Sequence, residues 1–407
     1  MMLRTAVCFF AIASFPHIGR AEEGPRVVGY YAEWTIYQRK YNVADIPAAK
    51  LTHINYAFAK IANGECAIFD SYAAIDKFHP GDDWNAGTLR GNFRELQRLK
   101  EKHKHLKTLI SVGGWTLSGP FSDVSLTPES RAKFANSCVA FAEKYGFDGV
   151  DIDWEYPVGG GDAGNKTRPE DRQNYTKLLA EIRKQLDAAG EARKVRYLLT
   201  IAAPAGPKTF ANLELDGVAK LCDWVNLMAY DFHGSWSDKT NHHAALYANP
   251  KDPTADESVR TQWNVSAAVA NYIKAGVPAE KIVVGVPFYG RGWGGVKNEN
   301  DGLYQAHAAL IPPGTHEPGN WDYKDIAANY VGKKGTRHWD AVAKAPWLFD
   351  AKTGLFITYD DEESIDLKAA FVRTERLGGI MAWELSGDTK GHSLLDAVRK
   401  GLKPAAK

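Results

Sequence analysis

The chain has 407 residues, of which 44% are hydrophobic and 24% charged, a composition typical of a globular protein with a large core. Its formal net charge of +1 at pH 7 argues against a general attraction to nucleic acid or to an acidic surface. The 12 Trp, 18 Tyr and 17 Phe residues are core material, and aromatic rings also stack on flat ligands in clefts.

The N-terminal residues resemble a secretory signal peptide. Arg4 precedes the apolar run AVCFFAIASF, and Gly19 and Ala21 then supply small residues at the spacing that signal peptidase prefers. We therefore predict a signal peptide over residues 1–21 and a secreted protein, extracellular or periplasmic. No later segment reaches about 18 uninterrupted apolar residues, so we predict no contact with a membrane.

Eight short apolar segments are predicted to be buried strands, because they are rich in Val, Ile and aromatic residues and are flanked by Gly, Asp or Lys. They cover residues 26–34, 51–59, 107–115, 147–155, 197–205, 224–232, 281–290 and 378–387. Amphipathic segments between them repeat their apolar residues at helical spacing, and several begin near Pro and end at Gly. These predicted helices cover residues 93–106, 128–146, 169–190, 261–276 and 364–378.

The alternation of strand and helix predicts an α/β fold with parallel strands. Eight strands favour a closed (β/α)8 TIM barrel over an open doubly wound sheet, and no GxGxxG motif opens the first unit. Residues 292–357 show no clear βα unit, and a loop of that length without structure of its own is unusual. We predict a small α+β insertion domain there, between strands seven and eight, and a barrel made of residues 22–291 and 358–407.

The fourth predicted strand carries an unusual set of acids in the stretch GFDGVDIDWEYP, residues 146–157. Side chains alternate along a strand, so Asp151, Asp153 and Glu155 share one face, which points into the barrel. Asp148 has the opposite parity and is predicted to have a structural role. The other face packs against the surrounding helices and consists of Val150, Ile152 and Trp154.

Carboxyl groups stacked in a barrel interior cannot all ionise cheaply, so at least one is expected to keep a proton near neutral pH. Glu155 is the outermost, at the carboxyl end of the strand where this fold carries catalysis, and is the candidate general acid. A metal site and a structural acid cluster are alternatives, although no His or Cys lies near in sequence and the spacing is not that of a calcium loop. An ordinary retaining glycosidase would need a second carboxylate as nucleophile about 5 Å away, and Asp153 is the only obvious candidate.

Five motifs in order along the chain resemble those of glycoside hydrolase family 18, the chitinases. DGVDIDWE fits the DxxDxDxE signature of that family, and the insertion is placed as in its larger-groove subfamily. The other four motifs are SVGG (111–114), MAYDFHG (228–234), YGRGW (289–293) and GGIMAWELSGD (378–388). The resemblance runs from about Arg26 to Leu402 and implies the barrel fold with no cofactor and no metal.

The resemblance also implies a reaction: retaining, substrate-assisted hydrolysis of the β-1,4 bonds between N-acetylglucosamine units of chitin. The N-acetyl oxygen of the substrate attacks the anomeric carbon and forms an oxazolinium ion, which explains why no nucleophilic carboxylate is needed. Glu155 protonates the leaving oxygen and then acts as base on water. Asp153 holds the acetamido nitrogen, Asp151 shares a proton with Asp153, and Tyr230 binds the acetamido oxygen.

Further roles carry over by motif position. Trp383 forms the floor under the distorted sugar, with a core Trp as the alternative, and Met228 lines the acetyl pocket. Trp115 and Trp236 are stacking platforms, with loop packing as the alternative. Arg291 contacts a sugar or an Asp, with a surface ion pair as the alternative. The remaining predicted substrate-binding residues are Tyr30, Phe58, Gly114, Tyr156, Asp231 and Tyr289; Ser111, like Tyr30, is expected to hydrogen-bond Asp151.

The expected partners are therefore chitin and chitooligosaccharides. The protein itself is expected to be a monomer. Two rival functions remain: a sugar-binding lectin on the same scaffold, and an N-glycan-cleaving endo-β-N-acetylglucosaminidase. Three Asn-X-Ser/Thr sequons, at Asn165, Asn174 and Asn264, match glycosylation sites, but chance matches are common. Three cysteines lie beyond the predicted signal, an odd number with wide spacing, and we expect them to be buried free thiols: Cys66, Cys138 and Cys222.

Overall fold

The computed structural model of the chain describes residues 24–85 and 87–404. The predicted signal peptide, residues 1–21, lies outside the described residues. The predicted strands form the parallel barrel, in the order β1, β14, β8, β7, β6, β5, β4 and β2, and pairing of β1 with β2 closes it. Their bounds are β1 Arg26–Ala32, β2 His53–Ala62, β4 Lys107–Gly113, β5 Gly149–Asp153, β6 Leu198–Pro204, β7 Trp224–Met228, β8 Ile282–Pro287 and β14 Gly379–Trp383. The TIM-barrel prediction is confirmed.

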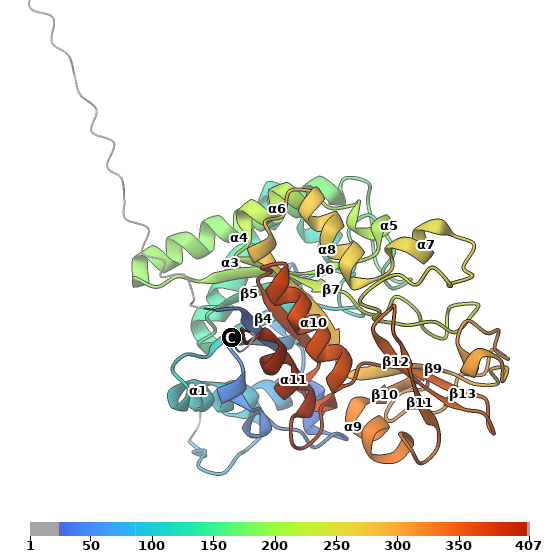
Figure 1. Cartoon of the computed structure of the whole chain (residues 1–407). Helices are drawn as coiled ribbons and strands as arrows, with labels where there is room; N and C mark the ends of the chain where they lie inside the picture. The colour runs from blue at the N-terminus through green and yellow to red at the C-terminus, as the bar shows by residue number, and fades with distance from the viewer. Residues whose placement is uncertain (1–23, 86, 405–407) are drawn as a thin grey trace, which may run out of the picture.

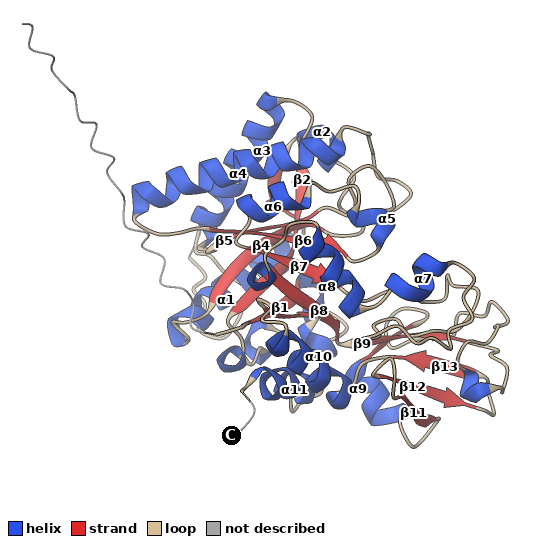
Figure 2. Ribbon diagram, turned by 45° about the horizontal axis from the view of Figure 1, so that its top comes forward, coloured by secondary structure: helices blue, strands red, loops and turns tan. Residues whose placement is uncertain are grey.

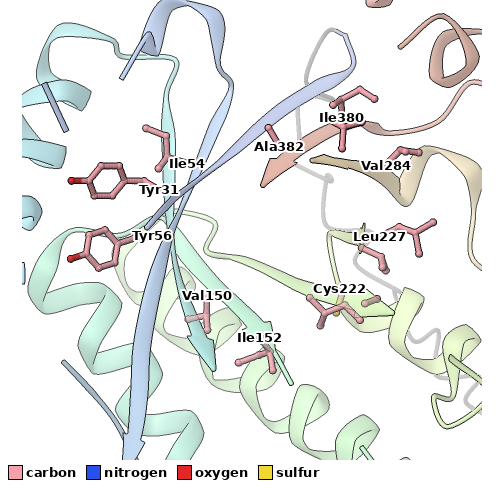
Figure 3. Packing of buried hydrophobic residues seen from close by; sticks show 14 of the residues in the cluster. Tyr31, Ile54, Tyr56, Val150, Ile152, Cys222, Leu227, Val284, Ile380 and Ala382 are labelled. Carbon is pink, nitrogen blue, oxygen red and sulfur yellow. The ribbon is translucent and has the colours of Figure 1, made fainter. Parts of the chain in front are cut away.

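Helices surround the barrel (Figure 2), and buried apolar side chains of the helices and strands form one core cluster. Figure 3 shows Val150 and Ile152 on the side of β5 that faces these helices. Trp154 lies in the same layer, stacked on Phe121 with ring centroids 5.3 Å apart. The helices are α1 Gly91–Lys102, α2 Phe121–Val124, α3 Pro128–Tyr145, α4 Asp171–Arg193, α5 Pro207–Phe210, α6 Leu215–Leu221, α7 Glu257–Gln262, α8 Val265–Lys274, α10 Glu362–Thr374 and α11 Ser393–Leu402.

Local sequence explains why the long helix α3 begins and ends where it does. Thr127 caps its start by accepting a hydrogen bond from the Ser130 N–H at 3.2 Å, and Pro128 occupies the first turn, where no amide hydrogen is needed. Gly146 ends the helix with φ of 78°, a left-handed conformation that glycine adopts without steric cost. The next residues enter β5, so this helix end sets where the acidic strand starts.

The insertion between the seventh and eighth barrel strands is a five-stranded antiparallel sheet with short helical segments. It lies beside the barrel, on the side opposite α3 and α4 (Figures 1 and 2). The sheet begins at Tyr289, before the predicted boundary at residue 292, because YGRGW forms a strand that pairs with β10 and β13 rather than with the barrel. The strands of this sheet are β9 Tyr289–Trp293, β10 Asn320–Asp322, β11 Thr336–Asp340, β12 Ala345–Asp350 and β13 Leu355–Thr358, and the insertion also contains helix α9 Tyr323–Asp325.

A short strand, β3 Glu65–Ile68, pairs antiparallel with the end of β2 outside the barrel proper. Cys66, Cys138 and Cys222 are buried free thiols, as predicted. Asp148 accepts a hydrogen bond from the Thr108 N–H at 2.8 Å and pairs with Lys100 at 2.5 Å, so it fastens the entry of β5 to β4 and α1. In the part of the chain that the structure describes, no helix is both long and apolar enough to cross a membrane.

Candidate active site

The acidic face of β5 points into the barrel, and its three carboxyl groups follow one another toward the carboxyl end of the strand. Asp151 and Asp153 are buried within β5, and Glu155 lies just beyond the strand's end. The alternation that the sequence predicted therefore holds. The three acids differ sharply in what surrounds them, and this difference decides what each can do.

Asp151 is the deepest carboxyl group, and protein donors occupy both of its oxygens. Tyr30 Oη and Ser111 Oγ donate to Oδ2 at 2.6 and 2.7 Å, and Thr200 Oγ1 and Asn226 Nδ2 donate to Oδ1 at 2.5 and 3.2 Å. Burial raises the pKa of Asp151, and these hydrogen bonds oppose that rise by stabilising the carboxylate. Asp151 is thus held rigidly by four other strands of the barrel.

Asp153 has almost no protein support. Its Oδ1 atom is buried and has no hydrogen-bond partner in the described part of the chain. Burial, then the neighbouring charges of Glu155 and Asp151, raise the pKa of Asp153 well above the ordinary value, so the proton of the acid cluster resides readily here. By contrast, the four donors around Asp151 occupy both of its oxygens. A buried carboxyl group without a partner is primed to accept one from a ligand.

Glu155 occupies the mouth of the cluster. Burial raises its pKa to about 7, the negative charge of Asp231 adds to the rise, and a hydrogen bond with Tyr156 opposes it. A carboxyl group with this pKa keeps its proton in a large fraction of molecules at neutral pH and can give it up on demand. That is the property of a general acid that later serves as a base.

Asp231, on the turn after β7, faces this acid and is held as an anion. It accepts two hydrogen bonds from Arg291, at 2.8 and 2.6 Å, and one from Tyr289 Oη at 2.8 Å. Burial alone would raise the pKa of Asp231, but the charge and hydrogen bonds of Arg291, with His243 Nδ1 3.6 Å from Oδ1, hold it well below the usual range. The ion pair of Arg291 therefore lies inside the cleft rather than on the surface, and it keeps a fixed negative charge near Glu155.

A cavity of about 1090 Å³ opens above these acids, between the barrel and the insertion sheet. It is large enough for several linked sugar rings, and 12 of its 28 lining residues are aromatic. Thirteen of the residues predicted from the sequence line it. They are Tyr30, Phe58, Trp115, Asp153, Glu155, Tyr156, Met228, Tyr230, Asp231, Trp236, Tyr289, Arg291 and Trp383.

Two predicted residues lie behind the cavity wall. Asp151 is below Asp153 and reaches the cavity only through it. Gly114 lies under Phe58: a Cβ atom at Gly114 would be 2.6 Å from the Phe58 ring, and its φ of 84° also favours glycine. Gly114 therefore lets the Phe58 ring lie flat against the β4 loop and does not itself face a ligand.

Aromatic rings form the floor and the rim of the cavity. Trp383, at the end of β14, packs on Tyr30 and Phe58 with ring centroids 5.3 and 5.7 Å apart, which places it in the floor and not among the outer helices. Trp115 and Trp236 are 49% and 56% exposed, and such exposed flat rings on a cavity rim stack on sugar faces. The guanidinium of Arg291 lies 5.3 Å from the Trp236 ring and supports it.

Sequence reasoning missed several cavity residues. Trp34 follows β1 and packs 6.4 Å from Trp383, and Glu384 follows Trp383 directly. Their positions just after strand ends were the available signal, since this edge of a barrel carries its site. Arg39 and Asn320 had no such signal, because one lies in a loop and the other in the insertion. The other missed lining residues include Phe69, Leu117, Thr209, Trp263 and Glu317.

The donor set does not favour the metal alternative. Within residues 24–85 and 87–404 there is no group of three or more His, Cys, Asp or Glu side chains placed to hold a metal ion. The acid cluster instead presents one saturated carboxyl group, one orphaned carboxyl group and one with a pKa near neutrality. Carboxyl groups whose surroundings differ in this way are suited to proton transfer.

Comparison with known proteins agrees with this geometry. The family model described as glycosyl hydrolases family 18 matches residues 26–388. The chain belongs to glycosyl hydrolase family 18. It is 44% identical to chitinase A1 of Niallia circulans over 95% of this chain and 60% of that protein, and 39% identical to chitinase 1 of Aphanocladium album over 92% and 84%. The solved structure of chitinase ChiA74 from Bacillus thuringiensis matches with a TM-score of 0.87 and 41% identity, over 93% of this chain and 70% of that one.

Proposed function

We propose that this family 18 glycoside hydrolase is a chitinase, which cleaves the β-1,4 bonds between N-acetylglucosamine units of chitin and chitooligosaccharides. One observation carries the proposal: Glu155 holds a proton near neutral pH at the cavity mouth, while the buried Asp153 beneath it has an oxygen without a protein partner. The acid can protonate a glycosidic oxygen. The orphaned carboxyl group can accept a hydrogen bond from an acetamido nitrogen of the substrate.

The residues divide the work of a retaining, substrate-assisted reaction. Glu155 donates its proton to the leaving oxygen as the acetamido oxygen of the substrate bonds to the anomeric carbon and the glycosidic bond breaks. Asp153 accepts the acetamido N–H and stabilises the positive charge of the oxazolinium ring. Glu155, now a carboxylate, then takes a proton from water as the water oxygen attacks the anomeric carbon and opens that ring.

Tyr230 and Asp151 support this sequence. The Tyr230 hydroxyl lies 4.0 Å from Met381 Sδ, its one side-chain partner in the described residues, so it remains available to hydrogen-bond the acetamido oxygen. Asp151, with its four donors, anchors the base of the cluster and supplies part of the charge that raises the pKa of Asp153. The acid cluster is therefore electrostatically prepared before the substrate binds.

The lectin alternative and the N-glycan alternative receive less support from the site. A lectin would not need the proton held on Glu155. A hydrolase of branched N-glycans would not need a cavity of about 1090 Å³ rimmed by several aromatic platforms, which suits a linear chain of sugar rings instead. Both alternatives are open to direct test.

Replacing the acid tests catalysis. Glu155→Gln keeps the size of the side chain but cannot donate or accept the catalytic proton, so kcat on a chitin hexamer should fall by about 10²–10⁴-fold. Binding of the hexamer, measured by calorimetry, should persist. Turnover that survives this substitution would contradict the assignment of Glu155 as the acid.

Comparing substrates tests specificity. The wild-type protein should hydrolyse N-acetylated chitin oligomers with retention at the anomeric carbon, should spare oligomers that lack the acetyl groups, and should release little from a high-mannose glycoprotein. Activity on the glycoprotein alone would establish the N-glycan alternative. Binding of chitin oligomers without any hydrolysis would establish the lectin.

The protein is further proposed to be a secreted monomer. The signal-like sequence of residues 1–21 supports export, and the cavity is built within one chain. Mass spectrometry of protein recovered from the culture medium of a producing strain should give a mature N-terminus near residue 22, and light scattering should give the mass of a single chain. Retention of the full-length chain inside the cell would contradict export.

A further inference from the structure

Two loops meet behind the catalytic acid and enclose its peptide groups. The first loop follows β4 and contains Ser118, whose Oγ accepts the Glu155 N–H at 2.9 Å. The same hydroxyl donates to the Gly114 carbonyl oxygen at 2.8 Å and lies 3.1 Å from that of Asp153. Ser118 is fully buried, so the amide hydrogen of Glu155 has a fixed acceptor that water cannot replace.

The second loop follows β5 and supplies the partner for the other side of the same residue. Asn165 Nδ2 donates to the Glu155 carbonyl oxygen at 2.9 Å. The loop also packs directly on this carbonyl, since a Cβ atom at Gly161 would be only 2.0 Å from it. Asn165 is itself fixed, because its N–H donates to the Asp162 carbonyl oxygen at 3.0 Å. Both backbone polar groups of Glu155 are therefore held by side chains.

Ion pairs bind the two loops to each other. Lys166 Nζ lies 2.6 Å from Asp123 Oδ2, and Arg168 Nη2 lies 2.8 Å from Asp123 Oδ1. Arg168 Nη1 also donates to Ser122 Oγ at 2.6 Å. Asp123 and Ser122 belong to α2, close along the chain to Ser118, so Asn165 and Ser118 approach Glu155 from one connected unit.

We propose that Asn165 is a positioning residue that fixes the carboxyl group of Glu155 over Asp153. We further propose that the asparagine of the sequon Asn165-Lys-Thr makes this hydrogen bond and does not carry a glycan. The proposal rests on the proposed chitinase function. The hydrogen bond from Asn165 sets the orientation of the Glu155 peptide, and that peptide sets where the side chain leaves the backbone. A displacement of about 1 Å at the acid is enough to cost up to about a hundredfold in rate.

The other two sequons give a useful contrast. Asn174 is buried within α4. Asn264 caps α8, where its Oδ1 accepts the Ala267 N–H at 2.9 Å and its Nδ2 donates to the Thr261 carbonyl oxygen at 3.0 Å. Each sequon asparagine thus has an internal partner or a buried position. Asn165 differs from them because its partner is the catalytic acid.

The test compares Asn165→Ala and Asn165→Asp with Thr167→Ala. Thr167 is exposed, and its substitution destroys the sequon without touching the hydrogen bond to Glu155. Asn165→Asp keeps the shape of the side chain but removes the donor. The readouts are kcat and KM on a chitin hexamer, the melting temperature, and the pKa of Glu155 followed by NMR of 13C-labelled glutamate, which needs no catalysis.

Both Asn165 variants should lower kcat by at least about tenfold with KM changed less than about twofold, because the acid moves while the aromatic platforms stay. Asp153, Asp231 and Tyr156, which surround the Glu155 carboxyl group, are unchanged in every variant. In Asn165→Ala the pKa of Glu155 should nevertheless fall toward the ordinary value, because a loosened loop admits water and relieves the burial that raises it. The pKa comparison is confined to this variant, since the new carboxylate of Asn165→Asp would itself raise the pKa of Glu155. Thr167→Ala should match the wild type in all readouts.

Two results would overturn the proposal. In one, Asn165→Ala matches Thr167→Ala in kcat and in the pKa of Glu155. In the other, kcat falls only in step with the melting temperature while the pKa of Glu155 is unchanged, which indicates a merely structural asparagine. A wild-type protein that turns over no chitin oligomer would refute the proposed function instead, and the NMR comparison would still decide the role of Asn165.

Discussion

The three acids at β5 and its carboxyl end all carry a carboxyl group, but each carboxyl group has a different environment. Asp151 is surrounded by donors, Asp153 Oδ1 has no partner, and Glu155 lies at the cavity within the field of Asp231. Burial raises the pKa of all three acids, but their hydrogen bonds and neighbouring charges differ, and we therefore propose different roles for them: anchor, substrate acceptor and proton donor. The surrounding donors and charges, and not the residue type, decide how readily each carboxyl group holds a proton.

Removing the charge at Asp231 should move the alkaline limit of activity. The negative charge of Asp231 raises the pKa of Glu155, so Asp231→Asn should lower that pKa. Glu155 would then lose its proton at lower pH, and the alkaline limb of the bell-shaped profile of kcat/KM, expected near pH 7, should shift toward acid by about one unit. Steady-state kinetics on a soluble chitin oligomer across pH would measure this. A limb that moves toward alkaline pH would show that another group controls it.

Glu33 should make stability depend on pH away from the active site. Burial raises its pKa from 4.5 to about 8, and a hydrogen bond from Tyr56 at 2.9 Å opposes the rise. The folded state thus favours the protonated form, so the contribution of Glu33 to stability is full below about pH 4.5 and is lost as pH rises through about 8. Glu33→Gln should flatten this fall in the free energy of unfolding, measured by urea titration at about pH 6 and pH 9. An equal fall in both proteins would rule out Glu33 as its source.

At the scale of elements, loops and helices hold the strand ends in place. The turn that follows β13 carries Asp360, which forms a wholly buried ion pair with Lys368 of α10 and also accepts from Ser364 Oγ at 2.8 Å. This pair joins the end of the insertion sheet to the helix that leads into β14. The position of Trp383 at the end of β14 therefore depends on a contact outside the cavity.

Breaking this pair from one side should cost more than removing both charges. Lys368→Met leaves Asp360 buried without its cation, and we expect a loss of about 3–5 kcal/mol in the free energy of unfolding. The double variant Lys368→Met, Asp360→Asn leaves no buried charge and should recover much of that loss. Urea denaturation of the three proteins measures both effects. A double variant that is less stable than Lys368→Met would show that the unpaired charge of Asp360 is not the source of the loss.

At the scale of the whole molecule, the cavity exists because the insertion sheet stands beside the mouth of the barrel. Arg39, in a barrel loop, pairs with Asp322 of β10 at 2.5 Å and with Glu384 at 3.3 Å. All three side chains are largely buried, so this contact fixes the insertion to the barrel at the cavity edge. The width of the substrate groove is thus a property of two units held together.

Loosening this contact should weaken substrate binding before it affects chemistry. Arg39→Ala leaves two buried carboxyl groups facing each other, so the insertion wall should move away from the barrel. We expect KM for a chitin hexamer to rise roughly tenfold while kcat falls less, because Glu155 and Asp153 belong to the barrel alone. Arg39→Lys, which keeps the charge but loses the planar fork, should be intermediate. A fall in kcat at constant KM would instead place Arg39 close to the reacting atoms.

The strands, the barrel and the inward face of the acids could be predicted from the amino-acid sequence, because they depend on local periodicity: Asp151, Asp153 and Glu155 alternate with residues that must pack outward. The resemblance predicted two hydrogen-bond partners of Asp151, Tyr30 and Ser111, and the structure shows both. The other two partners depend on how the strands pack against one another. Thr200 and Asn226 come from two further strands and donate to Asp151 Oδ1, while Asp153 Oδ1 has no partner among the described residues. The proton shared between Asp151 and Asp153 stays a prediction from the resemblance.

The same reason explains the residues and boundaries that sequence reasoning missed. Arg39 and Asn320 reach the cavity through contacts between segments far apart in the chain, and Tyr289 joins the second sheet because of its pairing with β10. Such contacts leave no periodic signal, since a loop carries none. The sequence fixes which face of each element is buried, and packing of the elements against one another decides which side chains meet.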